Sequence, residues 1–227
     1  MNNLGNLHPI TIYLRQAINI FEKLGFDVYE GPEVDNEWYN FDAVNTPADH
    51  PSRDMQDTFW LKNGKLLRTQ TTNSQVRYGE THKPPIKVVV PGNVYRNEAT
   101  DYKHESTIIQ MEGLYIDKNV CVGNLFWTLR EFFKKMYGEK TKIRFRPSYF
   151  PFVEPGFEVD ALYKGKWLEL LGAGMVHPVV IKNMGIDPEK YSGFAFGLGI
   201  DRLAMLKFGI EDIRHFRSGD LRFLKQF

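Results

Sequence analysis

One stretch of the sequence, VVVPGNVYRNEATDYKHESTIIQMEG at residues 88–113, limits the possible folds more than any other. It opens with a run of valines, typical of a strand that is buried on both faces. Two strand-like arms separated by a polar loop then predict a β-hairpin inside the core. Residues two apart in a strand share a face, so Arg96 and Glu98 point the same way, as do Gln110 and Glu112 on the returning arm. If the arms pair, four polar side chains meet on one patch of sheet.

Two explanations of this polar patch stay open from these residues alone. It could be a solvated face with cross-strand ion pairs, each contributing roughly 0.2–1 kcal/mol. It could also be the floor of a binding site, because its neighbours along the strand are core residues.

The rest of the pattern predicts a single α+β domain over residues 1–227. Apolar residues recur at helical spacing after Pro9 and again within residues 119–138, and Gly25 and Gly138 are placed to end these helices. The last third alternates like strands, with a hairpin turn at residues 163–166. Strands joined by tight turns predict an antiparallel sheet, and we expect the helices to pack on one side of it.

Two local features complete this picture. A shorter helix is expected to begin near residue 72, with Thr72 or Asn73 as its cap. The polar, proline-containing residues 47–58 are expected to form a long surface loop.

Composition narrows the class of protein. The formal net charge of +1 gives no global basic field that would point to nucleic acid, although a local basic groove is compatible with it. The single cysteine, Cys121, cannot form an internal disulfide, which favours a reducing compartment. No apolar run approaches the roughly 20 residues of a membrane span. We therefore expect a cytoplasmic protein.

A second candidate site is GFAFGLGIDRLAML at residues 193–206. Gly193, Gly197 and Gly199 share a strand face, so a flat ligand could approach the backbone there. Arg202 follows in the first turn of a helix, the end that favours anions. A glycine-kinked strand with a surface arginine is the alternative interpretation.

Two glutamates, a pair of phenylalanines and a histidine suggest further chemistry. Phe150 and Phe152 alternate around a proline, with Glu154 next on the same face, and such aromatics form either core or a ring pocket. Glu154 is a candidate metal ligand at the edge of that pocket. Glu169 sits in an apolar strand, where a buried glutamate is rare unless it is paired or binds a cation. His177, before a proline, is either a ligand or a structural histidine.

These motifs resemble those of class II aminoacyl-tRNA synthetases. VYRNE and GFAFGLGIDRL are similar to motifs 2 and 3 of that class. The segments LHPI, FDAVNTPADHPSRDMQDTFW, LLRTQT, QMEGL, IRFRPSYFPF, GMVHP, SGFAFG and DLRFLKQF resemble the catalytic core of the bacterial-type phenylalanyl-tRNA synthetase α-subunit family. The resemblance covers nearly the whole chain, from Leu7 to Phe227.

The resemblance implies ATP-dependent activation of phenylalanine and its transfer to tRNA(Phe), with Mg²⁺ as the metal. It assigns the nucleotide to Arg96, Glu98, His104, Ile108, Gly197, Gly199 and Arg202, with the two arginines as catalytic residues. It assigns phenylalanine to Trp60, Gln70, Thr72, Gln110, Glu112, Phe150, Phe152 and Ala195. Glu154 matches the family's magnesium position, and Glu169 is the second candidate metal ligand.

The sequence also departs from the family pattern. Ile108 and Ile109 stand where the family usually has Phe-His, so an aromatic stack on adenine, worth roughly 1–3 kcal/mol by analogy with base stacking, is replaced by apolar contact. The family's N-terminal tRNA-binding helical arm is not among these residues. We expect the family's β subunit as a partner in a heterotetramer, or a homodimer if the chain is alone. A paralogue that activates another amino acid or loads another acceptor, and a non-catalytic amino-acid-binding regulatory module, are the alternatives.

Overall fold

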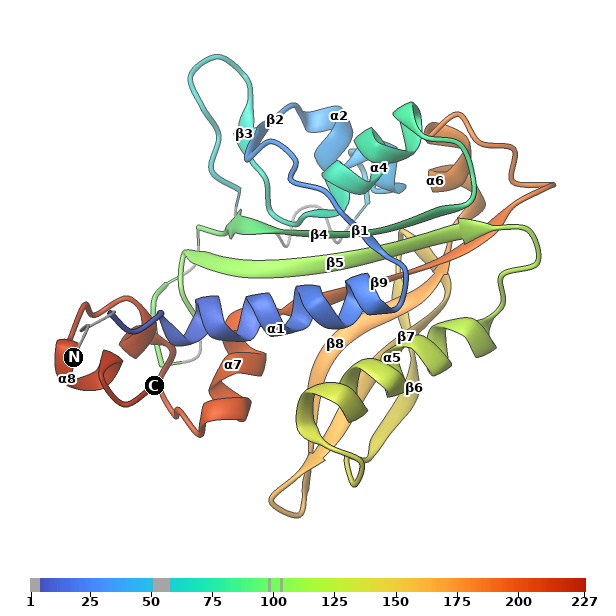
Figure 1. Ribbon diagram of the computed structural model, residues 1–227. Helices are drawn as coiled ribbons and strands as arrows, with labels where there is room; N and C mark the ends of the chain where they lie inside the picture. The colour runs from blue at the N-terminus through green and yellow to red at the C-terminus, as the bar shows by residue number, and fades with distance from the viewer. Residues whose placement is uncertain (1–4, 51–57, 98, 103) are drawn as a thin grey trace.

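A seven-stranded sheet runs through the molecule (Figure 1). The computed structural model describes residues 5–50, 58–97, 99–102 and 104–227. In the order β1-β4-β5-β9-β8-β7-β6, the strands are β1 (Asp27–Val28), β4 (Ile86–Tyr95), β5 (Thr107–Asp117), β9 (Ser192–Gly199), β8 (Lys166–Val176), β7 (Val153–Tyr163) and β6 (Ile143–Phe150). The neighbours pair antiparallel except β1, which is parallel to β4. The predicted antiparallel sheet is therefore confirmed for all strands but this short one.

The β4–β5 hairpin forms as the sequence predicts. Val88, Val89 and Val90 are fully buried. Val88 pairs with Leu114, and Val90 pairs with Glu112. Even-numbered residues of both strands therefore face one side of the sheet and odd-numbered residues the other.

Helices cover both faces of the sheet, so the expectation that they pack on one side is wrong (Figure 1). The central strands are apolar on both faces, and each face needs its own cover. One face carries α1 (Pro9–Lys23), α5 (Val122–Tyr137) and α7 (Ile200–Phe208). The other carries α2 (Glu37–Asn40), the 3₁₀ helix η1 (Asp42–Val44), α4 (Thr72–Thr81) and α6 (Pro178–Asn183), beside a small sheet of β2 (Val34–Asp35) and β3 (Leu66–Leu67).

Aromatic rings fill the core beneath α1 and α5. The ring of Phe21 stacks on Phe132 with centroids 4.8 Å apart and on Phe196 at 5.2 Å. At Gly113 an added Cβ would lie 2.1 Å from Phe196 Cζ, so the ring occupies the space that a side chain would need. This packing fixes β5 and β9 side by side.

Two helices begin with the same His-Pro pair. The Nδ1 atom of His8 accepts a hydrogen bond from the backbone N–H of Ile10, and that of His177 accepts one from Val179, both at 3.2 Å. His177 is therefore a structural cap, one of the two interpretations that the sequence left open.

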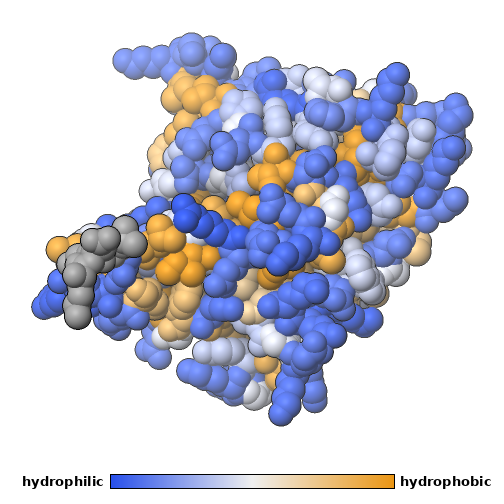
Figure 2. All heavy atoms as spheres, in the orientation of Figure 1, coloured by the Kyte–Doolittle hydropathy of each residue, from blue (hydrophilic) through white to orange (hydrophobic). Residues whose placement is uncertain are grey.

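The C-terminal segment, with the 3₁₀ helix η2 (Ile213–Phe216) and α8 (Leu221–Leu224), lies next to the start of α1 (Figure 1). On the face drawn in Figure 2, hydrophilic residues surround small apolar areas. Among the described residues, no helix has both the length and the apolar character that a bilayer span requires.

Candidate active site

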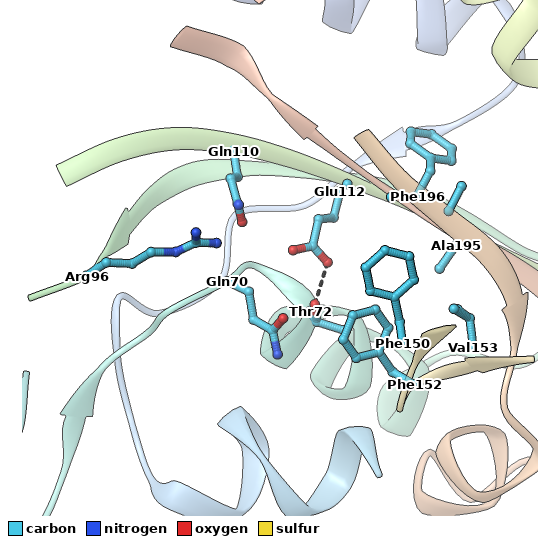
Figure 3. Close-up of a pocket in the computed structure, with 13 residues that line it drawn as sticks. Gln70, Thr72, Arg96, Gln110, Glu112, Phe150, Phe152, Val153, Ala195 and Phe196 are labelled. Carbon is cyan, nitrogen blue, oxygen red and sulfur yellow. Dashed lines mark hydrogen bonds between the residues drawn. The ribbon is translucent and has the colours of Figure 1, made fainter. Parts of the chain in front are cut away.

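A pocket of about 200 Å³ lies on the sheet face that α4 covers (Figure 3). Strands β5, β6, β7, β8 and β9, the segments that follow β4 and β6, and the start of α4 with the residues before it contribute to its wall. The lining residues are Gln70, Thr72, Arg96, Gln110, Glu112, Phe150, Phe152, Val153, Gly172, Ala173, Ala195, Phe196 and Gly197.

Strand register brings distant parts of the sequence into this pocket. Glu112 on β5 pairs with Gly197 on β9, which pairs with Gly172 on β8. One step along the same face, Gln110 pairs with Gly199. The glycines therefore form a floor without side chains next to the polar residues of β5, as the spacing predicted for β9.

Polar side chains gather at one end of the pocket (Figure 3). Arg96, Gln110 and Glu112 line it together, as the two-residue spacing predicted. Arg96 continues the hairpin beyond β4, because its backbone N–H donates to the carbonyl of Ser106 at 2.9 Å. Glu98, the fourth member of the predicted group, lies outside the described residues.

Glu112 is a buried carboxylate at this polar end, 7% exposed. It accepts hydrogen bonds from the Thr71 backbone N–H at 3.1 Å, the Thr72 hydroxyl at 2.5 Å and the Gln75 amide at 3.3 Å. Burial raises the pKa of Glu112, and the hydrogen bonds from Thr72 and Thr71 oppose that rise. The site therefore holds a carboxylate that gains from a nearby cation.

The predicted cap of α4 is wrong. Thr71 is the N-cap, and its side chain makes no capping bond. The Thr72 hydroxyl bonds Glu112 across the pocket instead. A contact with a residue 40 positions away thus replaces the local bond that the helix pattern suggested.

Gln110 has an unsatisfied acceptor beside this carboxylate. Its side-chain Oε1 is buried and has no hydrogen-bond partner among the described residues. A buried acceptor without a partner costs about 1–3 kcal/mol, so a ligand that brings an N–H donor would gain by binding it.

Aromatic and small residues form the other end of the pocket. The rings of Phe150 and Phe152 stack with centroids 5.8 Å apart. Gly172 makes room for Phe150, because an added Cβ would lie 2.9 Å from its Cζ. Val153 and Ala195 complete an apolar slot (Figure 3). The ring-pocket alternative for these aromatics is the one that the structure supports.

Val153 and Gly172 were not predicted as pocket residues. Val153 starts β7 directly after the turn that carries Phe152, and Gly172 is recognisable only from its pairing with Gly197. For Val153, the sequence signal was its position directly after the pair Phe150 and Phe152.

The expected alignment of Glu154 with the two phenylalanines is wrong. The chain turns at residues 151–152 between β6 and β7, so the alternation stops there. The Glu154 side chain is 77% exposed, with its Oε2 3.6 Å from His177 Nε2.

Glu169 is not buried as expected. Its side chain is 54% exposed on β8, with an oxygen 3.7 Å from the Arg146 guanidinium. In the part of the chain that the structure describes, no three His, Cys, Asp or Glu side chains are grouped to hold a metal ion. The role of either glutamate as a metal ligand stays a prediction. Glu154, exposed at the start of β7, fits Mg²⁺ better than Glu169, whose neighbour is a cation.

Arg202 stands one turn beyond the glycine floor. It is exposed in the first turn of α7, and its Cβ is 4.0 Å from the point where a Cβ on Gly199 would lie. It does not line the pocket as the side chains stand.

Three other predicted residues also lie outside the pocket lining. The His104 side chain is exposed and bonds Asp101 at 2.9 Å. Ile108 packs partly buried against the core. Trp60 is 52% exposed and bridges to Leu66. Their proposed contacts with substrates stay predictions.

Arg68 is another buried charged residue, and no sequence pattern indicated it. It is 2% exposed and donates to the carbonyls of Asn93 at 2.7 Å and Gly31 at 3.0 Å. Its Nη2 atom lies 2.0 Å from the position that a Cβ on Gly92 would take, so glycine is required there. Burial lowers the pKa of Arg68, whereas nearby carboxylates, among them Glu112, oppose this. The Arg68 guanidinium thus stabilises the end of β4 beside the pocket through hydrogen bonds to backbone carbonyls.

Comparison with known proteins agrees with this geometry. The model of the class II core domain (F) of tRNA synthetases matches residues 1–227. The phenylalanine–tRNA ligase alpha subunits of Yersinia enterocolitica and Proteus mirabilis are each 53% identical over 224 residues, which cover 98% of this chain and 68% of the relative. The chain therefore belongs to the class II tRNA synthetase core domain (F) family.

Solved structures support the same fold. A pyrrolysyl-tRNA synthetase from Desulfitobacterium hafniense matches with a TM-score of 0.72 at 17% identity, over 93% of this chain and 74% of the other. A second structure of this enzyme matches with a TM-score of 0.70 at 19% identity, over 91% and 72%. These matches confirm the predicted α+β class II synthetase fold.

Proposed function

We propose that this protein activates phenylalanine with ATP and transfers the product to tRNA(Phe). The observation that carries the proposal is one continuous pocket with an apolar slot at one end and polar side chains around a buried carboxylate at the other. In the reaction, the carboxylate of phenylalanine attacks the α-phosphate of ATP and pyrophosphate leaves. The aminoacyl group of the adenylate then passes to a ribose hydroxyl at the tRNA 3′ end, and AMP leaves.

The amino acid would bind with its ring in the slot between Phe150, Phe152 and Ala195. Its ammonium group would then donate to the free Gln110 Oε1 and lie near the negative charge of Glu112. Gln70 and Thr72 line the space in between. This arrangement fixes the substrate carboxylate at the edge of the glycine floor, where positioning alone supplies much of the rate.

The nucleotide would lie over Gly197 and Gly199, whose missing side chains leave room for it. Arg96 at the polar end would hold the α-phosphate and stabilise the charge that develops on it. Arg202 at the start of α7 would reach the nucleotide from the other side, closing the clamp. Glu98 and Ile108 near the adenine, His104 at the phosphates and Trp60 at the entrance complete the proposed site.

Magnesium would bind together with ATP, because protein-bound Mg²⁺ is usually held by one or two carboxylates and by the phosphates of the substrate. Glu154 is the proposed carboxylate, with Glu169 as the weaker candidate. When bound, the ion would neutralise charge on the phosphates.

The wider context is proposed on the same basis. The name of the relatives, alpha subunit, supports a β subunit as partner in the family's heterotetramer. We assign the 227 residues to one catalytic core domain and its activity to the cytoplasm.

Amino-acid-dependent exchange of pyrophosphate into ATP tests this function. We expect exchange with phenylalanine and much less with tyrosine, because the apolar end of the slot would bury the tyrosine hydroxyl without a hydrogen bond. The assay is run with the chain alone and again with the β subunit of a relative. Exchange with a different amino acid would indicate a paralogue, and binding of phenylalanine without exchange in either assay would indicate a regulatory module.

A further inference from the structure

The C-terminal segment contacts β5 and α7, two elements that carry residues proposed for the nucleotide. Arg217 follows η2, and its Nη2 atom donates to the Thr107 carbonyl at 3.2 Å and to Asp201 Oδ1 at 3.4 Å. Thr107 starts β5, and Asp201 lies in the first turn of α7. One guanidinium therefore joins two elements that are 94 positions apart in the chain.

Asp201 extends this connection to the strand that carries Gln110. Its Oδ2 accepts the backbone N–H of Ile109 at 2.5 Å, and its side chain is only 3% exposed. Burial raises the pKa of Asp201, while Ile109 and Arg217 oppose the rise. A carboxylate removed from water needs this cation and this N–H donor, so the three groups hold one another in place.

The residues next to these contacts belong to the proposed site, Arg202 and Ile108 for the nucleotide and Gln110 for phenylalanine. Asp201 is followed by Arg202, and Ile109 is flanked by Ile108 and Gln110. Thr107 follows Ser106, whose carbonyl accepts the backbone N–H of Arg96. The Arg217–Asp201 pair thus links the helix start that carries Arg202 to the strand end that lies next to the backbone partner of Arg96.

Further contacts hold the C-terminal segment itself in place. The Ile213 N–H donates to the Tyr102 carbonyl, in the loop after Arg96, at 3.2 Å. On the other side, His8 Nε2 lies 3.0 Å from the Phe216 carbonyl. The segment is thereby attached to the loop and to the start of α1.

We propose that Arg217 is a positioning residue for nucleotide binding, which acts through Asp201 to set Arg202 relative to Arg96 and β5. The inference rests on the proposed function, and it adds a role for the C-terminal segment. Arg217 itself does not contact the substrate in this scheme. It fixes the backbone on which the nucleotide-binding side chains stand.

The test compares Arg217→Ala with Arg214→Ala by equilibrium binding of ATP and of phenylalanine. Arg214 lies in η2 and bonds Asp212, two residues away, so it is a matched control. We expect Arg217→Ala to weaken ATP binding about tenfold, the scale of one lost charge-assisted hydrogen bond. Phenylalanine binding should change less than ATP binding, since the slot that holds its ring lies on other strands and only Gln110 and Glu112 of its proposed site stand on β5. Arg217→Lys should restore part of the ATP affinity.

A double-mutant cycle with Asp201→Asn tests whether Arg217 acts on ATP binding through Asp201. In that background Arg217→Ala should weaken ATP binding less than about twofold, because its partner charge is already gone. Equal loss of ATP and phenylalanine affinity, unchanged ATP affinity in Arg217→Ala, or full additivity in the cycle would overturn the inference.

Amide hydrogen exchange separates this inference from the proposed function. In Arg217→Ala, a peptide covering residues 107–111 should exchange faster, while one covering residues 170–176 should not change. If the unmodified chain binds neither ATP nor phenylalanine, the proposed function fails, and the exchange result still decides whether Arg217 positions β5. Unchanged exchange at residues 107–111 would overturn that role.

Discussion

The two ends of the pocket are built by different means. At the apolar end, the ring of Phe150, stacked on Phe152, stands directly against Gly172 of the sheet, and the shape is set by packing. At the polar end, Gln110 keeps an acceptor without a partner, and Gly197 and Gly199 leave the sheet open. The apolar end is complete before a ligand arrives, whereas the polar end is completed by one. Substitutions should therefore separate amino-acid binding from nucleotide binding.

The largest expected effect comes from filling the slot. Ala195→Trp places an indole in a pocket of about 200 Å³, so phenylalanine binding should fall below detection in calorimetry. ATP affinity should stay within about twofold, because the polar end lies on other side chains. Ala195→Gly at the same position is the control for a change without added volume. Retained phenylalanine affinity in Ala195→Trp would mean that the amino acid binds elsewhere.

Removing the guanidinium at the polar end should have the opposite selectivity. Arg96→Ala should weaken ATP binding about 10- to 100-fold, the range expected for losing a hydrogen bond to a charged group. Phenylalanine affinity measured without ATP should be nearly unchanged. If both affinities fall together, the two ends are not separate in the way that the structure suggests.

Glu112→Gln should reduce phenylalanine affinity about tenfold, because the amide lacks the negative charge that the ammonium group would face. The same variant also tests the raised pKa of Glu112.

Between pH 4.5, the ordinary pKa of a glutamate, and the raised pKa of Glu112 in the folded chain, the unfolded chain has lost the Glu112 proton while the folded chain still holds it. The wild-type free energy of unfolding should therefore decrease with rising pH in this window relative to Glu112→Gln. Parallel pH profiles from denaturant unfolding would contradict the assignment.

The smallest expected effect is on the free energy of unfolding, when a glycine at each end of the pocket is replaced by alanine. Gly172→Ala forces a methyl against the Phe150 ring and should lower the free energy of unfolding by about 1–3 kcal/mol. Gly199→Ala, with only Arg202 Cβ at 4.0 Å, should change it by less than about 0.5 kcal/mol. Thermal unfolding of both variants measures the difference. Equal losses would indicate that the slot is not packed as described.

Features that depend on strand periodicity could be predicted from the sequence. The hairpin, the shared face of Arg96, Gln110 and Glu112, and the glycine face of β9 all follow from a two-residue repeat, which is local. The slot could be expected from Phe150, Phe152 and Ala195 through the family resemblance.

Features that depend on long-range contacts could not be predicted. Thr72 bonds Glu112 rather than capping α4, since the sheet brings its better partner close. Glu169 is exposed because β8 enters the core only after it, at Leu170, and the apolar residues around Glu169 gave no sign of this in the sequence. Arg68 is buried by backbone carbonyls, which have no sequence signature.

The most direct test of a shared pocket is the binding of a stable phenylalanyl-adenylate analogue, measured by calorimetry on the wild type and two variants. One analogue should bind per chain, much more tightly than phenylalanine or ATP alone, because it would occupy both ends together. Ala195→Trp and Arg96→Ala should each weaken it strongly. Binding of two analogues per chain, or unchanged affinity in either variant, would contradict a single pocket that holds the ring and the nucleotide side by side.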